Sequence, residues 1–400
     1  MKNKIFFYGA VVAAVTLFLT PAAHATNGMK LIGVGPVQRA MGGASVGLPL
    51  DSAATITNPA GISRVGSRVD FGVTYFNPDV KYKANSTTGQ VTNNDATISS
   101  DASAFVIPAF GMVLPSKTKF TFGIGAYGVS GMGVDYKSNL YNNVTYSKYG
   151  FLKFAPAMAY SWSDQLSVGI APNINYAAMD FEAGATTQKA HHGGTAYGLG
   201  FTLGALYKAT ELLSFGLAYE SKQNFPDFKF NTSAGTDRFE FNQPQSIAGG
   251  IGVRPNDRLR MAFDMAWINW SQTNGKDQPV YTENNRSASA WNMNWDDKFV
   301  YKAGVEFDLN SKLTLRGGYN YGKNPLDPVQ AFEAIAFPAI AEHHITAGFG
   351  LNITEQFGLN VGLMYAPEVS FDVANSAQAI NSATTSMSQY AVDVGIAYKF

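Results

Sequence analysis

The feature that most limits how this chain can fold is an alternation of apolar with polar or small residues, which recurs from about residue 69 to the end. Alternation with a period of two is typical of β-strands that have one apolar face. The last segment is the clearest case, because its large apolar residues all fall on one face: Tyr390, Val392, Val394, Ile396, Tyr398 and Phe400. A soluble sandwich alternates in the same rhythm, but the Gly, Ala and charged residues of the opposite face favour the lumen of a barrel over bulk water.

Fourteen segments carry this pattern, which predicts an all-β fold: a 14-stranded antiparallel transmembrane β-barrel. The expected strands are 69–83, 101–114, 118–129, 149–162, 165–182, 195–208, 212–229, 239–253, 258–273, 297–308, 312–321, 342–352, 356–370 and 387–400. Short connections (115–117, 163–164, 208–211, 254–257, 308–311 and 352–355) alternate with long ones (84–100, 130–148, 183–194, 230–238, 274–296, 322–341 and 371–386). This alternation is expected of periplasmic turns and extracellular loops, and not of a Greek-key sandwich.

The composition agrees with a barrel and excludes several other classes of protein. The chain has 28 Phe, 20 Tyr, 5 Trp and 40 Gly, and only 14% of its residues are charged, against roughly 25% in ordinary soluble domains. Its mean hydropathy is −0.06, and beyond the N-terminus no run reaches the ~18–20 apolar residues that a spanning helix needs. The formal net charge is zero, so we expect no general attraction to nucleic acid. The absence of cysteine excludes disulfides and acylation as a lipoprotein.

Residues 1–25 are expected to be a cleaved signal peptide. Lys2 and Lys4 give a basic start, 5–19 are mostly apolar, and Ala23-His24-Ala25 offers a small-residue cleavage site. The mature protein would therefore be exported to the bacterial outer membrane, with outer-membrane lipid and lipopolysaccharide around it, as a monomer.

Residues 26–68 do not alternate and are rich in glycine and other small residues. A barrel of fourteen strands has a lumen too wide for its own side chains to fill. We therefore expect 26–68 to form a compact plug in the lumen, and 69–400 to form the barrel around it.

Three stretches of the sequence resemble a known family. They are residues 39–44 (RAMGGA), the tripeptide Asn58, Pro59 and Ala60, and residues 76–80 (FNPDV). With the fourteen strands, they make the chain similar to the outer-membrane long-chain fatty acid transporters of the FadL type, which include the aromatic-hydrocarbon channels (TodX). The resemblance implies an N-terminal hatch domain that plugs the lumen, and a kink in the third strand that opens a gap in the wall.

The third expected strand ends in a glycine-rich run that suits such a kink at Gly128, Gly131 and Gly133. Glycine weakens a strand interior and permits bulges. The alternative is that these glycines only make room in a crowded lumen.

The implied function is passive uptake of hydrophobic molecules, most simply long-chain fatty acids, through an extracellular apolar groove, past the hatch, and out sideways at the third strand. Candidate groove residues lie in the expected long loops: Leu140, Trp291, Trp295, Phe332, Ile335, Phe337 and Ile340. These side chains could instead pack on one another or dip into the rim of the bilayer. For a fatty-acid carboxylate, the inward-facing Lys302 and Arg316 are possible contacts, although lumen charges such as Asp264, Glu306 and Asp393 could pair with them.

Two other functions stay open, namely an aromatic-hydrocarbon channel of the same family and a general diffusion porin. An enzyme is not expected, because no Gly-x-Ser-x-Gly elbow supports an outer-membrane lipase: residues 43–47 (GASVG) have this spacing, but they do not follow an expected strand, as a nucleophile elbow does. The adjacent histidines at 191–192 and 343–344 point apart on an extended chain, so we predict no metal site and no cofactor.

Overall fold

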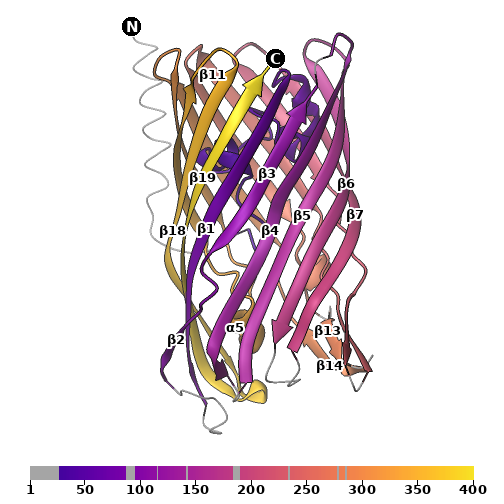
Figure 1. Ribbon diagram of the computed structural model, residues 1–400, viewed down its shortest axis with the longest axis vertical. Coiled ribbons are helices and arrows are strands. Elements are labelled where there is room, and N and C mark those ends of the chain that lie inside the picture. The colour runs from indigo at the N-terminus through magenta and orange to yellow at the C-terminus, as the bar shows by residue number, and fades with distance from the viewer. Residues whose placement is uncertain are drawn as a thin grey trace.

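The computed structural model describes residues 27–86, 95–114, 116–140, 143–182, 190–232, 235–276, 279–283 and 286–400. They form the closed antiparallel barrel that the alternation predicted (Figure 1). The wall strands are β1 (Arg68–Asn85), β3 (Phe105–Val113), β4 (Phe120–Leu140), β5 (Asn143–Ser161), β6 (Leu166–Glu182), β7 (Ala190–Lys208), β8 (Leu213–Glu220), β11 (Ser246–Asn256), β12 (Leu259–Ile268), β15 (Lys298–Asp308), β16 (Leu313–Gly322), β17 (His343–Asn352), β18 (Phe357–Asn375) and β19 (Ile380–Lys399). The ring closes where β1 pairs with β19 along its whole length. The short β2 (Thr97–Ser99) is an appendage of β1.

The outer face of the wall is apolar, as expected of a surface that meets lipid. The six apolar residues of the last segment are each 36–50% exposed, while Ala391, Asp393 and Ala397 between them are buried. Among the described residues, no helix is long and apolar enough to cross a membrane.

At the end of the barrel with the long connections, several of the predicted boundaries between strands and loops are wrong. The segments 130–148 and 371–386 are mostly strand, because the β4–β5 and β18–β19 ladders continue as hairpins beyond the apolar band. Conversely, 221–229 and 239–245 were expected in the wall, but β8 ends at Glu220 and β11 begins at Ser246. Residues 271–273, also expected as strand, belong to the short helix α4 (Ser271–Asn274).

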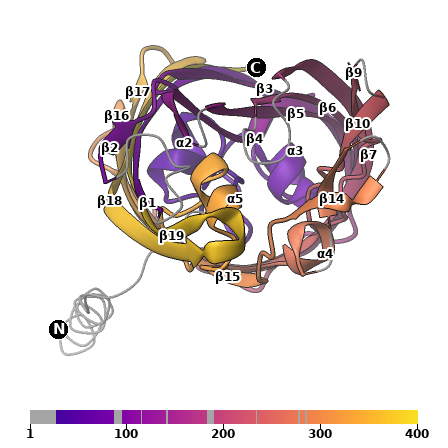
Figure 2. The ribbon, with the colours of Figure 1, turned by 90° about the horizontal axis from the view of Figure 1, so that it is seen from below.

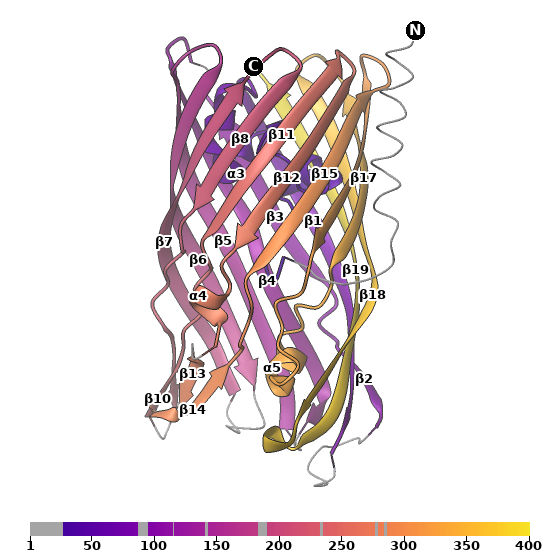
Figure 3. The same cartoon turned by 180° about the vertical axis from the view of Figure 1, so that it is seen from behind.

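The wall is therefore taller on one side than on the other (Figures 1 and 3). Strands β1, β4 to β7, β18 and β19 have 17 to 21 residues, whereas β8, β11, β12 and β15 to β17 have 8 to 11. At the end with the long connections, beyond the ends of the short strands, lie α4, α5 (Ala331–Ala336) and a small sheet of β9 (Phe228–Thr232), β10 (Gly235–Phe239), β13 (Pro279–Glu283) and β14 (Arg286–Asn292). The helix η2 (Ser376–Gln378) joins β18 to β19.

The segment from Asn27 to Ser67 lies inside the ring (Figure 2). It contains α2 (Gly35–Ala40), α3 (Ala54–Thr57) and η1 (Pro59–Ser63). Glycines on the inner face of the wall let it approach closely: a Cβ at Gly304 would lie 2.5 Å from Met41 O, and one at Gly216 would overlap Val46 O. Many glycines of the barrel therefore do make room in the lumen.

Candidate functional site

The wall has a gap between its second and third strands. β3 pairs with β1 along its whole length, but it pairs with β4 only at Ala109–Val113. From Gly128 onward β4 has lost this partner, while its ladder with β5 continues. Residues 105–108 of β3 pair with β1 alone, so one edge of β4 has no wall neighbour from Gly128 until Asp101 N donates to Asp135 O (2.8 Å).

A β-bulge at Val129 marks the start of the gap. The register between β4 and β5 shifts between Gly128 and Ser130. Before the bulge the inward-facing residues of β4 have odd numbers, as at Tyr127, and after it they have even numbers, as at Ser130 and Tyr136. An extra residue of this kind bends a strand and redirects its side chains. Gly128, Gly131 and Gly133 thus surround a local irregularity of the third wall strand.

The free edge of β4 is covered from inside by the start of the N-terminal segment. Residues 27–32, which we term the tip, turn back at Asn27–Lys30 and run antiparallel to β4. Leu31 N donates to Val129 O (3.0 Å), Gly131 N donates to Met29 O (3.2 Å), and Ser130 Oγ donates to Met29 O (2.9 Å). The tip therefore supplies part of the backbone pairing that β3 does not.

A cavity of about 820 Å³ lies at this gap and reaches both sides of the wall. Its inner lining includes the buried Met29, Phe151 and Met387, whereas Gly150 and Leu152 lie on the outward positions of β5. Other lining residues come from 101–108 before and within β3, and from 128–133 of β4. The cavity is thus continuous between the lumen and the lipid-facing surface.

A second cavity, of about 150 Å³, lies on the other side of the tip, and Lys30, Leu31 and Ile32 line both. Three lysines line it, namely Lys30, Lys153 and Lys302, with the carboxylate of Glu220 between the first two. Lys153 Nζ is 2.6 Å and Lys30 Nζ 3.3 Å from Glu220 oxygens. Burial lowers the pKa of Lys30, although Glu220 opposes this effect.

Comparison with known proteins decides the family. A family model described as outer membrane protein transport protein (OMPP1/FadL/TodX) matches residues 12–400. The chain belongs to this family. It is therefore an outer-membrane channel for hydrophobic substrates, and the resemblance seen in the sequence is confirmed.

Solved structures of FadL/TodX proteins share the fold. A Pseudomonas aeruginosa FadL homologue is 15% identical, with a TM-score of 0.78 over 93% of this chain and 100% of that chain. The Pseudomonas putida toluene transporter TodX is 20% identical (TM-score 0.72; 92% and 99% covered), and the Ralstonia pickettii toluene transporter TbuX is 21% identical (TM-score 0.71; 92% and 99% covered). No curated protein matches the chain.

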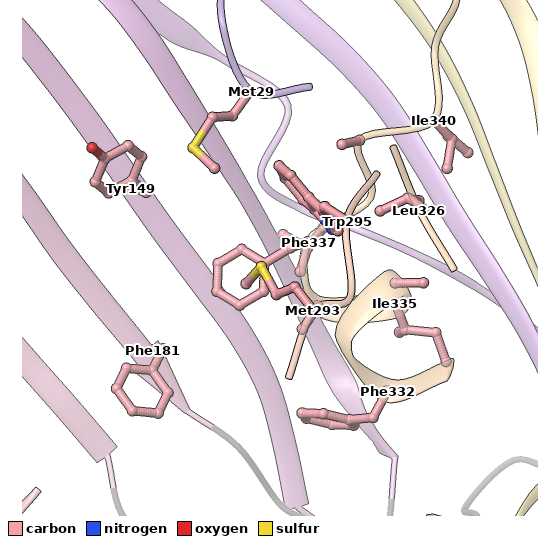
Figure 4. Close-up of a cluster of buried hydrophobic side chains, with 14 of the residues drawn as sticks. Met29, Tyr149, Phe181, Met293, Trp295, Leu326, Phe332, Ile335, Phe337 and Ile340 are labelled. Carbon is pink, nitrogen blue, oxygen red and sulfur yellow. The ribbon is translucent and has the colours of Figure 1, made fainter. Parts of the chain in front are cut away.

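In this FadL/TodX channel the candidate groove residues come together, but not in an exposed groove. Trp295, Phe332, Ile335, Phe337 and Ile340 are all buried in one apolar cluster with Met29 (Figure 4). These five side chains pack on one another, the alternative that the sequence left open, because 322–341 folds inward over the short strands. These five do not line the large cavity, although Pro338 and Ala339 do. The side chains of Leu140 and Trp291 lie outside the described residues.

The two candidate carboxylate contacts lie apart. Lys302 lines the smaller cavity and donates to Ile32 O (3.1 Å) and Gly43 O (3.5 Å). Arg316 lines neither cavity; it pairs with Glu306 (2.6 Å) and donates to Asn360 (3.0 Å) in the half nearer the short turns.

The Asn58-Pro59-Ala60 tripeptide joins the N-terminal segment to the wall. Asn58 Nδ2 donates to Val46 O (2.9 Å) and to Ala205 O of β7 (3.1 Å). A Cβ at Gly169 would lie 2.4–2.8 Å from Pro59 and Ala60 backbone atoms, so the wall and the tripeptide are in close contact.

The sequence did not identify the tip (27–32) or residues 102–108 as parts of the site, although both line the large cavity. Lys30 was the available signal, since it is the one charged residue in 26–38. In the part of the chain that is described, no group of three His, Asp or Glu could hold a metal.

We expect Gly128→Val to slow uptake several-fold. A Cβ there would collide with Ile107 Cγ2, so a valine pushes Ile107 across the base of the gap. Gly317→Val is the matched control, because a Cβ at Gly317 has ordinary contacts at 3.8 Å or more. Equal uptake of a radiolabelled fatty acid by the two variants would argue against a role for the gap.

Proposed function

We propose that this channel takes up long-chain fatty acids, which enter at the long-loop end, bind in the 820 Å³ cavity and leave sideways between β3 and β4. The observation that carries the proposal is the continuity of this cavity from the lumen to the lipid-facing surface. Residues 27–67 would act as the hatch that closes the axial route, after removal of residues 1–25 as a signal peptide.

The size and lining of the cavity suit a long alkyl chain. A volume of about 820 Å³ lies within the ~300–1,000 Å³ typical of sites that bury a drug-sized ligand, and exceeds the need of one aromatic ring. Burial of each CH₂ contributes about 0.8 kcal/mol. The inner end offers a cation, because Lys30 lines the cavity, and the smaller cavity beyond the tip adds Lys153 and Lys302. A carboxylate could use these lysines; a hydrocarbon could not.

Aromatic hydrocarbons are the second candidate. The side chains that line the cavity include Met29, Met132, Met364 and Met387 beside Phe105 and Phe151. Methionine adapts to ligand shape and makes favourable contacts with aromatic rings. Two of the similar structures are described as toluene transporters. A diffusion porin is disfavoured, because the segment 27–67 occupies the lumen.

The test is uptake by cells without a fatty-acid transporter of their own. We expect the protein to raise the uptake of radiolabelled hexadecanoate several-fold over the empty vector, and to leave toluene uptake unchanged. Faster toluene uptake with unchanged hexadecanoate would favour the aromatic channel. A large, steady conductance in a planar bilayer would instead indicate an open pore.

A further inference from the structure

The N-terminal segment is held to the wall by two ion pairs of different strength. Arg39 Nε on α2 lies 2.9 Å from Asp393 Oδ2, and these side chains are only 1% and 0% exposed. Lys30 in the tip is 3.3 Å from Glu220, with 15% and 18% exposure. Lys30 Nζ also donates to Pro244 O at 3.4 Å. The body of the segment is therefore anchored more tightly than its tip.

Glu220 is shared between two lysines, and only one of them belongs to the tip. Its shorter contact is with Lys153 of β5, at 2.6 Å. Loss of the Lys30 contact would leave Glu220 paired with Lys153 within the wall. The ion pair of the tip can thus break without leaving a buried carboxylate alone, which is the costly outcome.

Release of the tip would change both cavities. Met29 and Leu31 cover the free edge of β4 at the gap, and residues 30–32 separate the large cavity from the small one. Glycine at 33 and at 35, where φ is +69°, gives the chain a place to bend at the start of α2.

A carboxylate in the large cavity would meet Lys30 as its most available cation. The other arginine and lysine side chains that line this cavity are Arg39 and Lys148, and the buried ring of His344 lines it too. Arg39 is committed to Asp393 and also donates to Thr74 (3.4 Å), and Lys148 is exposed on the outer face. The ion pair of Lys30 with Glu220 (3.3 Å) is longer and more exposed than that of Arg39 with Asp393 (2.9 Å).

We infer that Glu220 is a positioning residue that holds the tip on β4 through Lys30, and that an anionic headgroup releases the tip by competing with Glu220 for this lysine. The inference rests on the proposed uptake of fatty acids and adds a selectivity to it: acids open the gap, whereas neutral molecules of the same length do not. A carboxylate can replace the counter-charge that Glu220 gives Lys30, whereas an alcohol is a neutral acceptor and would leave the buried ammonium without a counter-charge, so an alcohol competes poorly.

Hydrogen–deuterium exchange of peptides that contain residues 27–34 tests the inference on the full-length protein in detergent. Hexadecanoate should raise exchange in the natural protein about tenfold, as expected for the loss of a hydrogen bond between charged groups, and hexadecanol should not. Lys30→Met, which keeps the Lys153–Glu220 pair, and Glu220→Gln should exchange fast without ligand. Glu182→Gln is the control, since Glu182 pairs with His192 far from the tip.

The outcomes separate the two proposals. Slow exchange in both Lys30→Met and Glu220→Gln would overturn the role of Glu220, and so would an equal response of the natural protein to acid and alcohol. Absence of hexadecanoate binding to the natural protein would instead reject the proposed substrate, while the variants without ligand would still report on the ion pair.

Discussion

Replacement of Arg39 with methionine is expected to lower the free energy of unfolding by about 3–5 kcal/mol, the usual cost of removing one partner of a buried ion pair. Arg39 reaches from α2 to Asp393 of β19 and to Thr74 of β1. These two wall residues are register partners where the first and last strands close the ring. Arg39 thus joins the N-terminal segment to the closing seam, and its loss leaves Asp393 buried with only Thr74.

The matched control is Arg64→Met. Arg64 belongs to the same segment but is exposed and donates to Asp164 O (2.6 Å), so we expect a loss within about 1 kcal/mol. Unfolding in guanidinium chloride, followed by tryptophan fluorescence, measures both. The double variant Arg39→Met/Asp393→Leu should regain much of the loss, because it leaves no buried charge unpaired. Equal destabilisation by the two arginine variants would show that Arg39 is no special anchor.

The strands of the wall were predictable because each one carries the same alternation of apolar with polar or small residues. Every strand that faces lipid on one side and the lumen on the other must alternate, so residues such as Val392 and Val394 reveal the strand on their own. The alternation weakens beyond the apolar band, where the outward positions are polar too, as at Ser382 and Thr384. The hairpin extensions of β18–β19 and β4–β5 were for this reason taken for loops.

The site was less predictable, because it depends on contacts between distant parts of the chain. Lys30 and Glu220 are 190 residues apart, and no local pattern pairs them. The gap arises where β3 begins, and the glycines of β4 resemble those that only make room, such as Gly204 against Asn58. Phe332, Ile335, Phe337 and Ile340 were candidates from the sequence, but whether they face solvent or the lumen depends on the height of the wall beside them.

A bulky side chain at the outer mouth of the gap is expected to block the lateral route. Gly150 lies on β5 opposite Gly131, on the outer face of the gap, and lines the large cavity. A Cβ there would meet no atom within 4 Å. Gly150→Trp therefore places a large side chain at the mouth without disturbing the fold. Gly249→Trp is the matched control, since Gly249 of β11 has equally open space and pairs with the outward-facing Leu217 on another part of the wall.

The most direct measurement compares hexadecanoate uptake by cells that express these two variants at equal levels, together with hexadecanoate binding to the purified proteins. We expect Gly150→Trp to lose most of its uptake while it still binds hexadecanoate, and Gly249→Trp to match the natural protein in both. Full uptake by Gly150→Trp would contradict the lateral route and would mean that the substrate passes along the axis of the barrel.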